Sequence, residues 1–117
     1  MKIYTAFLFL AFIANNSYSQ NIAASQAKEY VGKNVTVCDQ VVMVKHATDV
    51  NRQPTFLDYG ANYPDEIFTV IIWGDDLSKF SYPLKSLEGK KICVTGTIIL
   101  YKGRAEIIVH DPDQIKK

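Results

Sequence analysis

The sequence predicts a small all-β domain: a five-stranded barrel preceded by one short helix and interrupted by an irregular connection. Five short segments rich in β-branched and aromatic residues are separated by turn-forming residues at regular intervals. The last two segments form a hairpin joined at Lys102 and Gly103, and Gly96 interrupts the first of them where a barrel strand must coil. A plain antiparallel sandwich is the alternative, but it would leave more strand edges unpaired.

Residues 1–19 are typical of a secretory signal peptide, since Lys2 precedes an apolar run and Ser17 and Ser19 fit a cleavage site. The run is shorter than the roughly 20 apolar residues that span a bilayer, so we expect cleavage rather than a retained anchor. The mature chain would then be residues 20–117, one domain without a membrane span, periplasmic or secreted.

The charge balance limits the function classes. The chain has 13 Lys and Arg against 12 Asp and Glu, and cleavage would remove Lys2, leaving a formally neutral protein. A neutral domain is a poor candidate for strong non-specific nucleic-acid binding, which usually needs a net basic surface. A local basic patch is still compatible with this composition.

The elements follow in order along the chain. Residues 24–31 favour a short helix, with Ser25 as its N-cap and Gly32 as its end. The segment 67–73 is apolar on both faces and should be the most buried strand. Pro83 lies within residues 76–87, which predicts an irregular or short helical connection. The five predicted strands are 34–44, 55–59, 67–73, 91–101 and 104–110.

Five stretches carry a resemblance to a known family: VTVCDQV, PTFLDYG, YPDEIFTVIIW, GKKICVTGTI and YKGRAEIIVHDPDQI, in that order. The mature chain resembles OB-fold (oligonucleotide/oligosaccharide-binding) domains that serve as DNA-binding modules in bacteria, some attached to secreted nucleases. The resemblance implies a Greek-key OB barrel. One departure is Asp39, where such domains commonly have Gly, so we expect a bulge at Asp39 and Gln40 to coil this strand.

Cys38 and Cys93 are the only two cysteines, and an even number in an exported domain favours a disulfide. In the OB arrangement the first and fourth strands are neighbours, which places both sulfurs on the same outer surface. Two free thiols or half of a metal site are the alternatives. Only His46 and His110 could add ligands, and neither has the spacing of a known motif.

The resemblance also implies a ligand face across the second and third strands, between the loop 45–54 and the turn 101–104. Cations lie beside aromatic residues in both connections, as in sites that hold single strands by backbone charge and base stacking. Asp49, Asp58, Asp65 and Glu66 lie nearby and would repel phosphate. The predicted nucleic-acid-binding residues are Lys45, His46, Arg52, Tyr59, Trp73, Tyr101, Lys102 and Arg104.

The leading hypothesis is a non-enzymatic, exported module that binds single-stranded nucleic acid, above all DNA, weakly. A protein- or glycan-binding module using the same face is the alternative, and the neutral charge favours it. We expect no cofactor or metal, because no catalytic motif is present and Asp75 and Asp76 are better explained as a turn than as a carboxylate pair.

Overall fold

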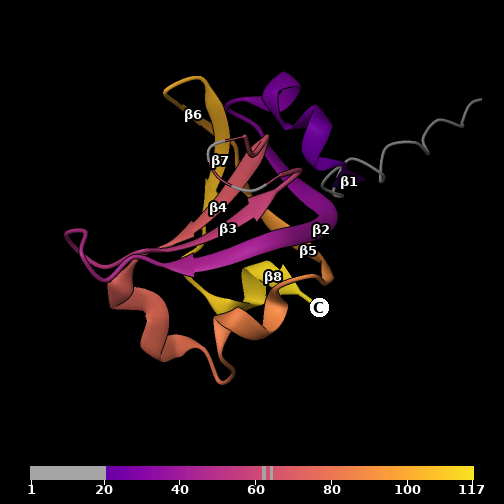
Figure 1. Cartoon of the computed structure of the whole chain (residues 1–117). Helices are drawn as coiled ribbons and strands as arrows, with labels where there is room; N and C mark the ends of the chain where they lie inside the picture. Colours follow the sequence, from indigo (N-terminus) through magenta and orange to yellow (C-terminus); the bar gives the residue numbers. More distant parts are fainter. Residues whose placement is uncertain (1–20, 62, 64) are drawn as a thin grey trace, which may run out of the picture.

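The computed structural model describes residues 21–61, 63 and 65–117; the predicted signal peptide lies outside this range. The chain forms one long strand, several short strands and short 3-10 helices around one apolar interior (Figure 1). The elements in chain order are β1 (Asn21–Ile22), η2 (Ala24–Tyr30), β2 (Asn34–His46), β3 (Thr55–Tyr59), β4 (Phe68–Ile72), η3 (Gly74–Lys79), η4 (Leu84–Leu87), β5 (Lys91–Thr97), β6 (Ile99–Tyr101), β7 (Arg104–Ile108), η5 (Pro112–Gln114) and β8 (Ile115–Lys116).

The long strand β2 holds the sheet together because it has two antiparallel partners. Its first half, from Asn34 to Gln40, pairs with β5, and its second half pairs with β3. The register shifts between Val41 and Met43, where the strand changes partner. The expected bulge at Asp39 and Gln40 is therefore wrong by about two residues, since the ladder with β5 continues without interruption through both.

The sheet is mostly antiparallel but includes one parallel pair, β4 with β7. The hydrogen-bonded order is β6-β7-β4-β3-β2-β5-β8, with β1 added beside β2. This path is open, so the prediction of a five-stranded barrel needs correction. The five expected strands are present, but the fourth is divided into β5 and β6, and the two-residue strands β1 and β8 extend the sheet.

Ile98 explains the division of the fourth strand. Its backbone N–H donates to the carbonyl of Lys33, and its own carbonyl accepts from the N–H of Gly32. Ile98 therefore bonds to the segment before β2, while β5 pairs with β2 and β6 pairs with β7. A sequence pattern shows a continuous β segment here, because the change of partner leaves no mark on side-chain alternation.

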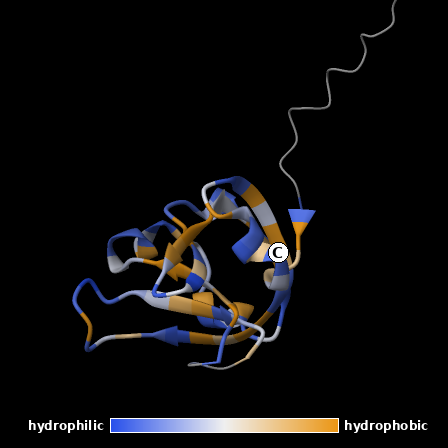
Figure 2. Ribbon diagram, turned by 90° about the horizontal axis from the view of Figure 1, so that it is seen from above, coloured by the Kyte–Doolittle hydropathy of each residue, from blue (hydrophilic) through white to orange (hydrophobic). Residues whose placement is uncertain are grey.

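Gly96 allows the sheet to curve tightly. A Cβ at this position would lie 2.6 Å from Cγ2 of Ile107, so the backbone of β5 approaches β7 more closely than a larger residue permits. Figure 2 shows that hydrophobic segments concentrate in the strands, whereas the projecting loops are largely hydrophilic. The interior includes Leu57, Tyr59, Phe68 and Val70, which are all fully buried.

The helical elements agree with the prediction in place but differ in detail. The first is the 3-10 helix η2, and it begins after Ala23 rather than at Ser25; the N–H of Ala23 donates to Oε1 of Gln26 at 2.9 Å. The N–H of Ala24 donates to Oδ2 of Asp39 at 2.9 Å, which fixes the start of η2 against the sheet. The expected irregular connection contains η3 and η4, as predicted.

The predicted disulfide is confirmed. Cys38 and Cys93 lie opposite each other in the β2–β5 ladder, with their Cα atoms 4.0 Å apart and a sulfur–sulfur bond between them. None of the helices in the described part of the chain has the length and apolar character needed to cross a bilayer.

Candidate functional site

The outer face of the sheet carries a row of buried polar residues at its centre. Asp58 on β3, Thr69 on β4 and Glu106 on β7 lie opposite one another in the register, and each is at most 4% exposed. Their neighbours along the strands point into the apolar interior, so these three side chains occupy the opposite face. This is the face on which the OB resemblance places a ligand.

The carboxyl groups of this row are shifted towards their neutral forms. Burial, and next the nearby carboxylate of Glu66, raise the pKa of Asp58 from 3.8 to about 6; Thr69 Oγ1 donates to Asp58 Oδ1 at 3.2 Å and opposes the shift. Burial also raises the pKa of Glu106. At neutral pH Asp58 is still largely ionised, so the centre of the face repels phosphate rather than attracting it.

Tyr59 was expected to stack on a ligand, and the structure contradicts this. Its ring is fully buried in the interior, 5.2 Å from the ring of Phe68 between centroids. Burial raises the pKa of its hydroxyl. The alternation along β3 explains the error, because Tyr59 shares its face with the core residue Leu57 and not with Asp58.

The predicted residues at the β2–β3 connection form one group, the loop end, defined here as Lys45, His46, Arg52, Trp73 and Asp75. The guanidinium carbon of Arg52 lies 4.5 Å from the centroid of the Trp73 ring, and its Nη2 lies 3.7 Å from Asp75 Oδ2. The carbonyl of Arg52 also accepts from the N–H of Gly74 at 2.8 Å. Arg52 and Trp73 thus contact each other, and these interactions hold the β2–β3 loop against the end of β4.

A hollow of about 320 Å³ lies beside the loop end, lined by Val44, His46, Thr55, Leu77, Phe80, Tyr82, Pro83, Leu84 and Lys85. Its lining is mainly apolar and aromatic. Lys45 and His46 are exposed at the end of β2. Of the cations at this end, Arg52 is paired with Asp75, whereas Lys45 forms no ion pair within the described residues and acts on the buried Asp58, whose rise in pKa it opposes.

The remaining predicted residues belong to the turn end, defined here as Lys28, Glu66, Tyr101, Lys102 and Arg104. Lys102 and Gly103 form the tight turn between β6 and β7, with φ values of 50° and 79°. Two positive φ values are characteristic of the type I′ hairpin turn, in which a lysine is an uncommon choice. The turn holds Tyr101, which is 53% exposed, beside Lys102, whose Nζ lies 5.3 Å from the ring centroid.

Arg104 follows this turn and is held by a buried carboxylate. Its Nε lies 3.3 Å from Glu66 Oε2, and the Glu66 side chain is only 3% exposed. Neither Lys28 nor Lys102 forms an ion pair with a carboxylate within the described residues. Within this group three cations accompany one carboxylate, and Arg104 also acts on the buried Asp58 and Glu106, where its charge opposes the rise in their pKa.

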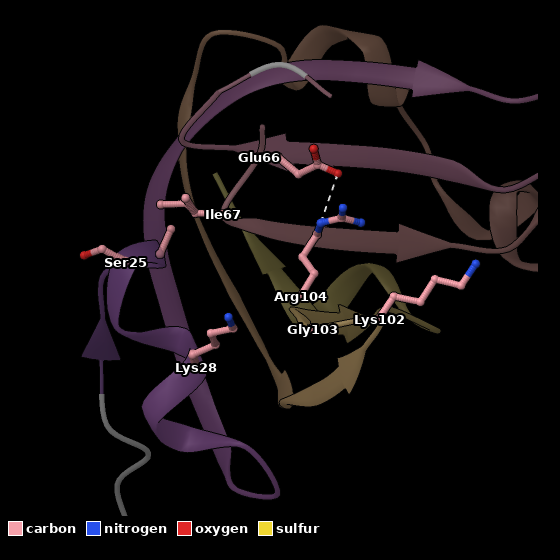
Figure 3. A pocket seen from close by; sticks show the side chains of 8 residues that line it. Ser25, Lys28, Glu66, Ile67, Lys102, Gly103 and Arg104 are labelled. Carbon is pink, nitrogen blue, oxygen red and sulfur yellow. Dashed lines mark ion pairs between the residues drawn. The ribbon is translucent and has the colours of Figure 1, made fainter. Parts of the chain in front are cut away.

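A pocket of about 410 Å³ lies between η2, the residues just before β4 and the β6–β7 turn, and Figure 3 shows it from close by. In this view Lys28 extends from η2 towards the pocket, Arg104 extends towards Glu66 with its terminal nitrogens on the side away from Lys28, and Lys102 extends away from Lys28. The residues that line it are Ala24, Ser25, Lys28, Glu66, Ile67, Lys102, Gly103 and Arg104.

Sequence reasoning did not single out Lys28 and treated Glu66 only as a source of repulsion. Lys28 reaches the pocket because η2 packs its small residues Ala24 and Ala27 into the core, and because Asp39 holds the start of η2. Asp39 itself stood out in the sequence as a departure from the family pattern. Its hydrogen bond with Ala24 joins residues that are distant in the chain, so it could be identified only from the tertiary structure.

No group of three His, Cys, Asp or Glu side chains within the described ranges is arranged to hold a metal ion. Asp75 and Asp76 pair with different partners, Arg52 for the first and Lys79 and His110 for the second. Lys79 in particular lowers the pKa of Asp76. The two carboxylates thus stabilise local structure at η3.

Comparison with known proteins supports the fold class. No family model and no curated protein sequence matches the chain. The chain is similar to one in the crystal structure of yeast Stn1 and Ten1, with a TM-score of 0.57 and 14% identity over 86% of this chain and 63% of that one. It thus spans less than two thirds of that chain's length. At this identity the likeness shows an OB-like all-β fold and no shared ligand.

A second structure, assigned as an aspartyl-tRNA synthetase from Leishmania major Friedlin, has a TM-score of 0.49 and 14% identity over 85% of this chain and 21% of that chain. This second likeness is too weak to indicate a shared fold.

Proposed function

We propose that the chain is an exported, non-enzymatic OB-like module that binds single-stranded nucleic acid weakly at the turn end. The observation that carries this proposal is the exposed ring of Tyr101 beside Lys102, next to a pocket that Lys28 and Arg104 enter. Aromatic rings stack on bases and cations hold the backbone in such sites. The compartment rests on the signal-like N-terminus and is compatible with the disulfide.

This proposal shifts the expected site along the sheet. The centre of the outer face carries Asp58 and Glu106, and the loop end carries an arginine already paired with Asp75. A strand bound across the whole face would have to pass these carboxylates at an electrostatic cost. A strand bound at the turn end would pass fewer of these carboxylates, although the charge of Arg104 is partly offset there by Asp58 and Glu106. This arrangement fits weak binding to a formally neutral chain.

The test is fluorescence anisotropy of a labelled single-stranded oligonucleotide with residues 20–117, at low and at physiological salt. Binding should be saturable and should weaken as salt rises. Tyr101→Ala should weaken it by about 1 to 3 kcal/mol, the contribution of one stacked base. Tyr101→Phe retains the ring and should bind like the parent. Equal affinity of parent and Tyr101→Ala would exclude this site.

A second candidate is a protein-binding module, and the surface of β6 favours it. Ile99, Leu100 and Tyr101 are 38%, 53% and 53% exposed, and β6 is the first strand of the open path. Exposed apolar side chains on a terminal strand are typical of interaction surfaces. Binding to a protein or glycan through these residues would change little with salt, which separates it from phosphate recognition.

A further inference from the structure

The pocket at the turn end is a local, partly open hollow rather than a channel that runs along the sheet. Three separate segments wall it: η2 supplies Lys28, the residues before β4 supply Glu66 and Ile67, and the turn supplies Gly103 and Arg104. Its volume of about 410 Å³ is within the range of small-molecule sites. A pocket lined by three segments can accommodate the end of a nucleic-acid strand or a single nucleotide.

The two cations that enter this pocket are available to an anion in different ways. The ion pair with Glu66 uses Nε of Arg104 and holds the side chain, which is 27% exposed. Its terminal nitrogens Nη1 and Nη2 make no hydrogen bond or ion pair within the described part of the chain. An arginine fixed in this way is preorganised to bind a phosphate through its remaining N–H groups.

Lys28 provides the second charge from the opposite wall, and its side chain is exposed. Gly103 lines the pocket beside Arg104, and an added Cβ there would meet no atom within 4 Å, so a ligand can approach the backbone of the turn. Two cations match a terminal phosphate, which carries about −1.5 to −2 charges, better than a backbone phosphodiester with a single charge.

We propose that this pocket binds a terminal phosphate, as presented by the phosphorylated end of a single strand or by a free nucleotide, through Lys28, Arg104 and the backbone of the turn. This proposal rests on the function proposed above and deepens it. Tyr101, outside the pocket, would then stack on a neighbouring base.

The first experiment compares oligonucleotides that carry a 5′-phosphate, a 3′-phosphate or hydroxyls at both ends, titrated by anisotropy with residues 20–117. One phosphorylated form should bind about tenfold more tightly than the hydroxyl form, the scale of one charged hydrogen bond. Lys28→Gln should abolish this difference. Lys91→Gln removes an exposed lysine from the start of β5, away from the pocket, and should preserve it. Equal binding of all three oligonucleotides by the parent would overturn the proposal while leaving the proposed function intact.

The second experiment separates the two sources of the phosphate by calorimetry with a nucleoside 5′-monophosphate, the matching nucleoside and inorganic phosphate. Binding of the monophosphate but not of the nucleoside, lost in Lys28→Gln, would support the pocket. If the parent then binds none of the three oligonucleotides, the pocket stands and the proposed function fails. Absence of binding by every phosphorylated probe would overturn the pocket as well. Far-ultraviolet circular dichroism should show that Lys28→Gln folds like the parent, because Lys28 has no partner to lose in the described structure.

Discussion

The loop end and the turn end lie at opposite ends of the same outer sheet face, and they differ in what their charges do. At the loop end Arg52 is held by Trp73 and Asp75, so its charge serves the local structure. At the turn end Glu66 holds only Nε of Arg104, and Lys28 and Lys102 are not paired with carboxylates within the described residues. Both ends contain cations and an aromatic ring, but at the loop end Arg52 and Trp73 stabilise the local structure, whereas the turn end is a candidate binding site.

The two ends also depend on different parts of the sheet. The turn end is carried by β6 and β7 and by η2, which packs beside the first half of β2, whereas the loop end is carried by the second half of β2 and by β3. The disulfide between Cys38 and Cys93 joins β2 to β5, so it lies in the part of the sheet that supports the turn end.

Removal of the disulfide should have the largest effect. The loop it closes has a sequence separation of 55, for which the chain-entropy model gives about 4 kcal/mol as an upper value. Cys38→Ser with Cys93→Ser should lower the free energy of urea unfolding by up to this amount. Hydrogen exchange should rise first in β5 and β6 and later in β3. Uniform exchange across the sheet would show that the disulfide does not favour one end.

Asp58 lies between the two ends, and its replacement should have the next largest effect. Because its folded pKa of about 6 is above its ordinary 3.8, the folded state binds more protons than the unfolded state between these values. Stability from this group therefore falls as the pH rises from about 4 to 6. Asp58→Asn should stabilise the protein at pH 7 by up to about 3 kcal/mol, at 1.36 kcal/mol for each pKa unit, and should change little below pH 4.

Urea unfolding at pH 4 and pH 7 checks this prediction, with Asp49→Asn as the control because Asp49 is an exposed loop carboxylate. In the Asp58→Asn variant Thr69 can still donate to the amide oxygen of the asparagine, so the variant keeps an equivalent hydrogen bond. An unfolding free energy that depends on pH equally in parent and Asp58→Asn would contradict the assignment. A stabilised variant would also show that the buried charge of Asp58 lowers the stability of the folded state.

Matched charge reversals at the two ends should give the third effect. Lys102→Glu should weaken oligonucleotide binding about tenfold at low salt and reduce the slope of affinity against salt by about one phosphate contact. Lys45→Glu reverses a lysine at the loop end that is also exposed, and should change the affinity no more than about twofold. Anisotropy at three salt concentrations measures both. Equal losses would restore the original expectation of a ligand that crosses the whole face.

The sequence predicted the strands well because alternation and turn residues are local signals. The strand 55–59 agrees with β3 at both ends, and the pairing of Cys38 with Cys93 followed from the order of strands in the fold. The change of partner at Ile98 could not be predicted in the same way. It depends on hydrogen bonds to Gly32 and Lys33, which are distant in the chain and carry no pattern of their own.

The candidate site was harder to predict for the same physical reason. Tyr101, Lys102 and Arg104 are adjacent in the chain, so their proximity was visible in the sequence. Lys28 belongs to the pocket only because of how η2 docks. Trp73 and Arg52 have the composition expected of a stacking site, and only the distance between them shows that they contact each other.

The smallest predicted effect belongs to that contact. Arg52→Ala removes a cation beside an aromatic ring and an exposed ion pair, which contribute about 1 kcal/mol or less. Urea unfolding should show this small loss, and the affinity for oligonucleotide should stay unchanged. Arg52→Lys retains the positive charge but lacks the planar group that stacks on Trp73, so it should recover only part of the stability. A loss of affinity in Arg52→Ala without a loss of stability would reverse the roles assigned to the two ends, because Arg52 would then act on the ligand rather than on its own loop.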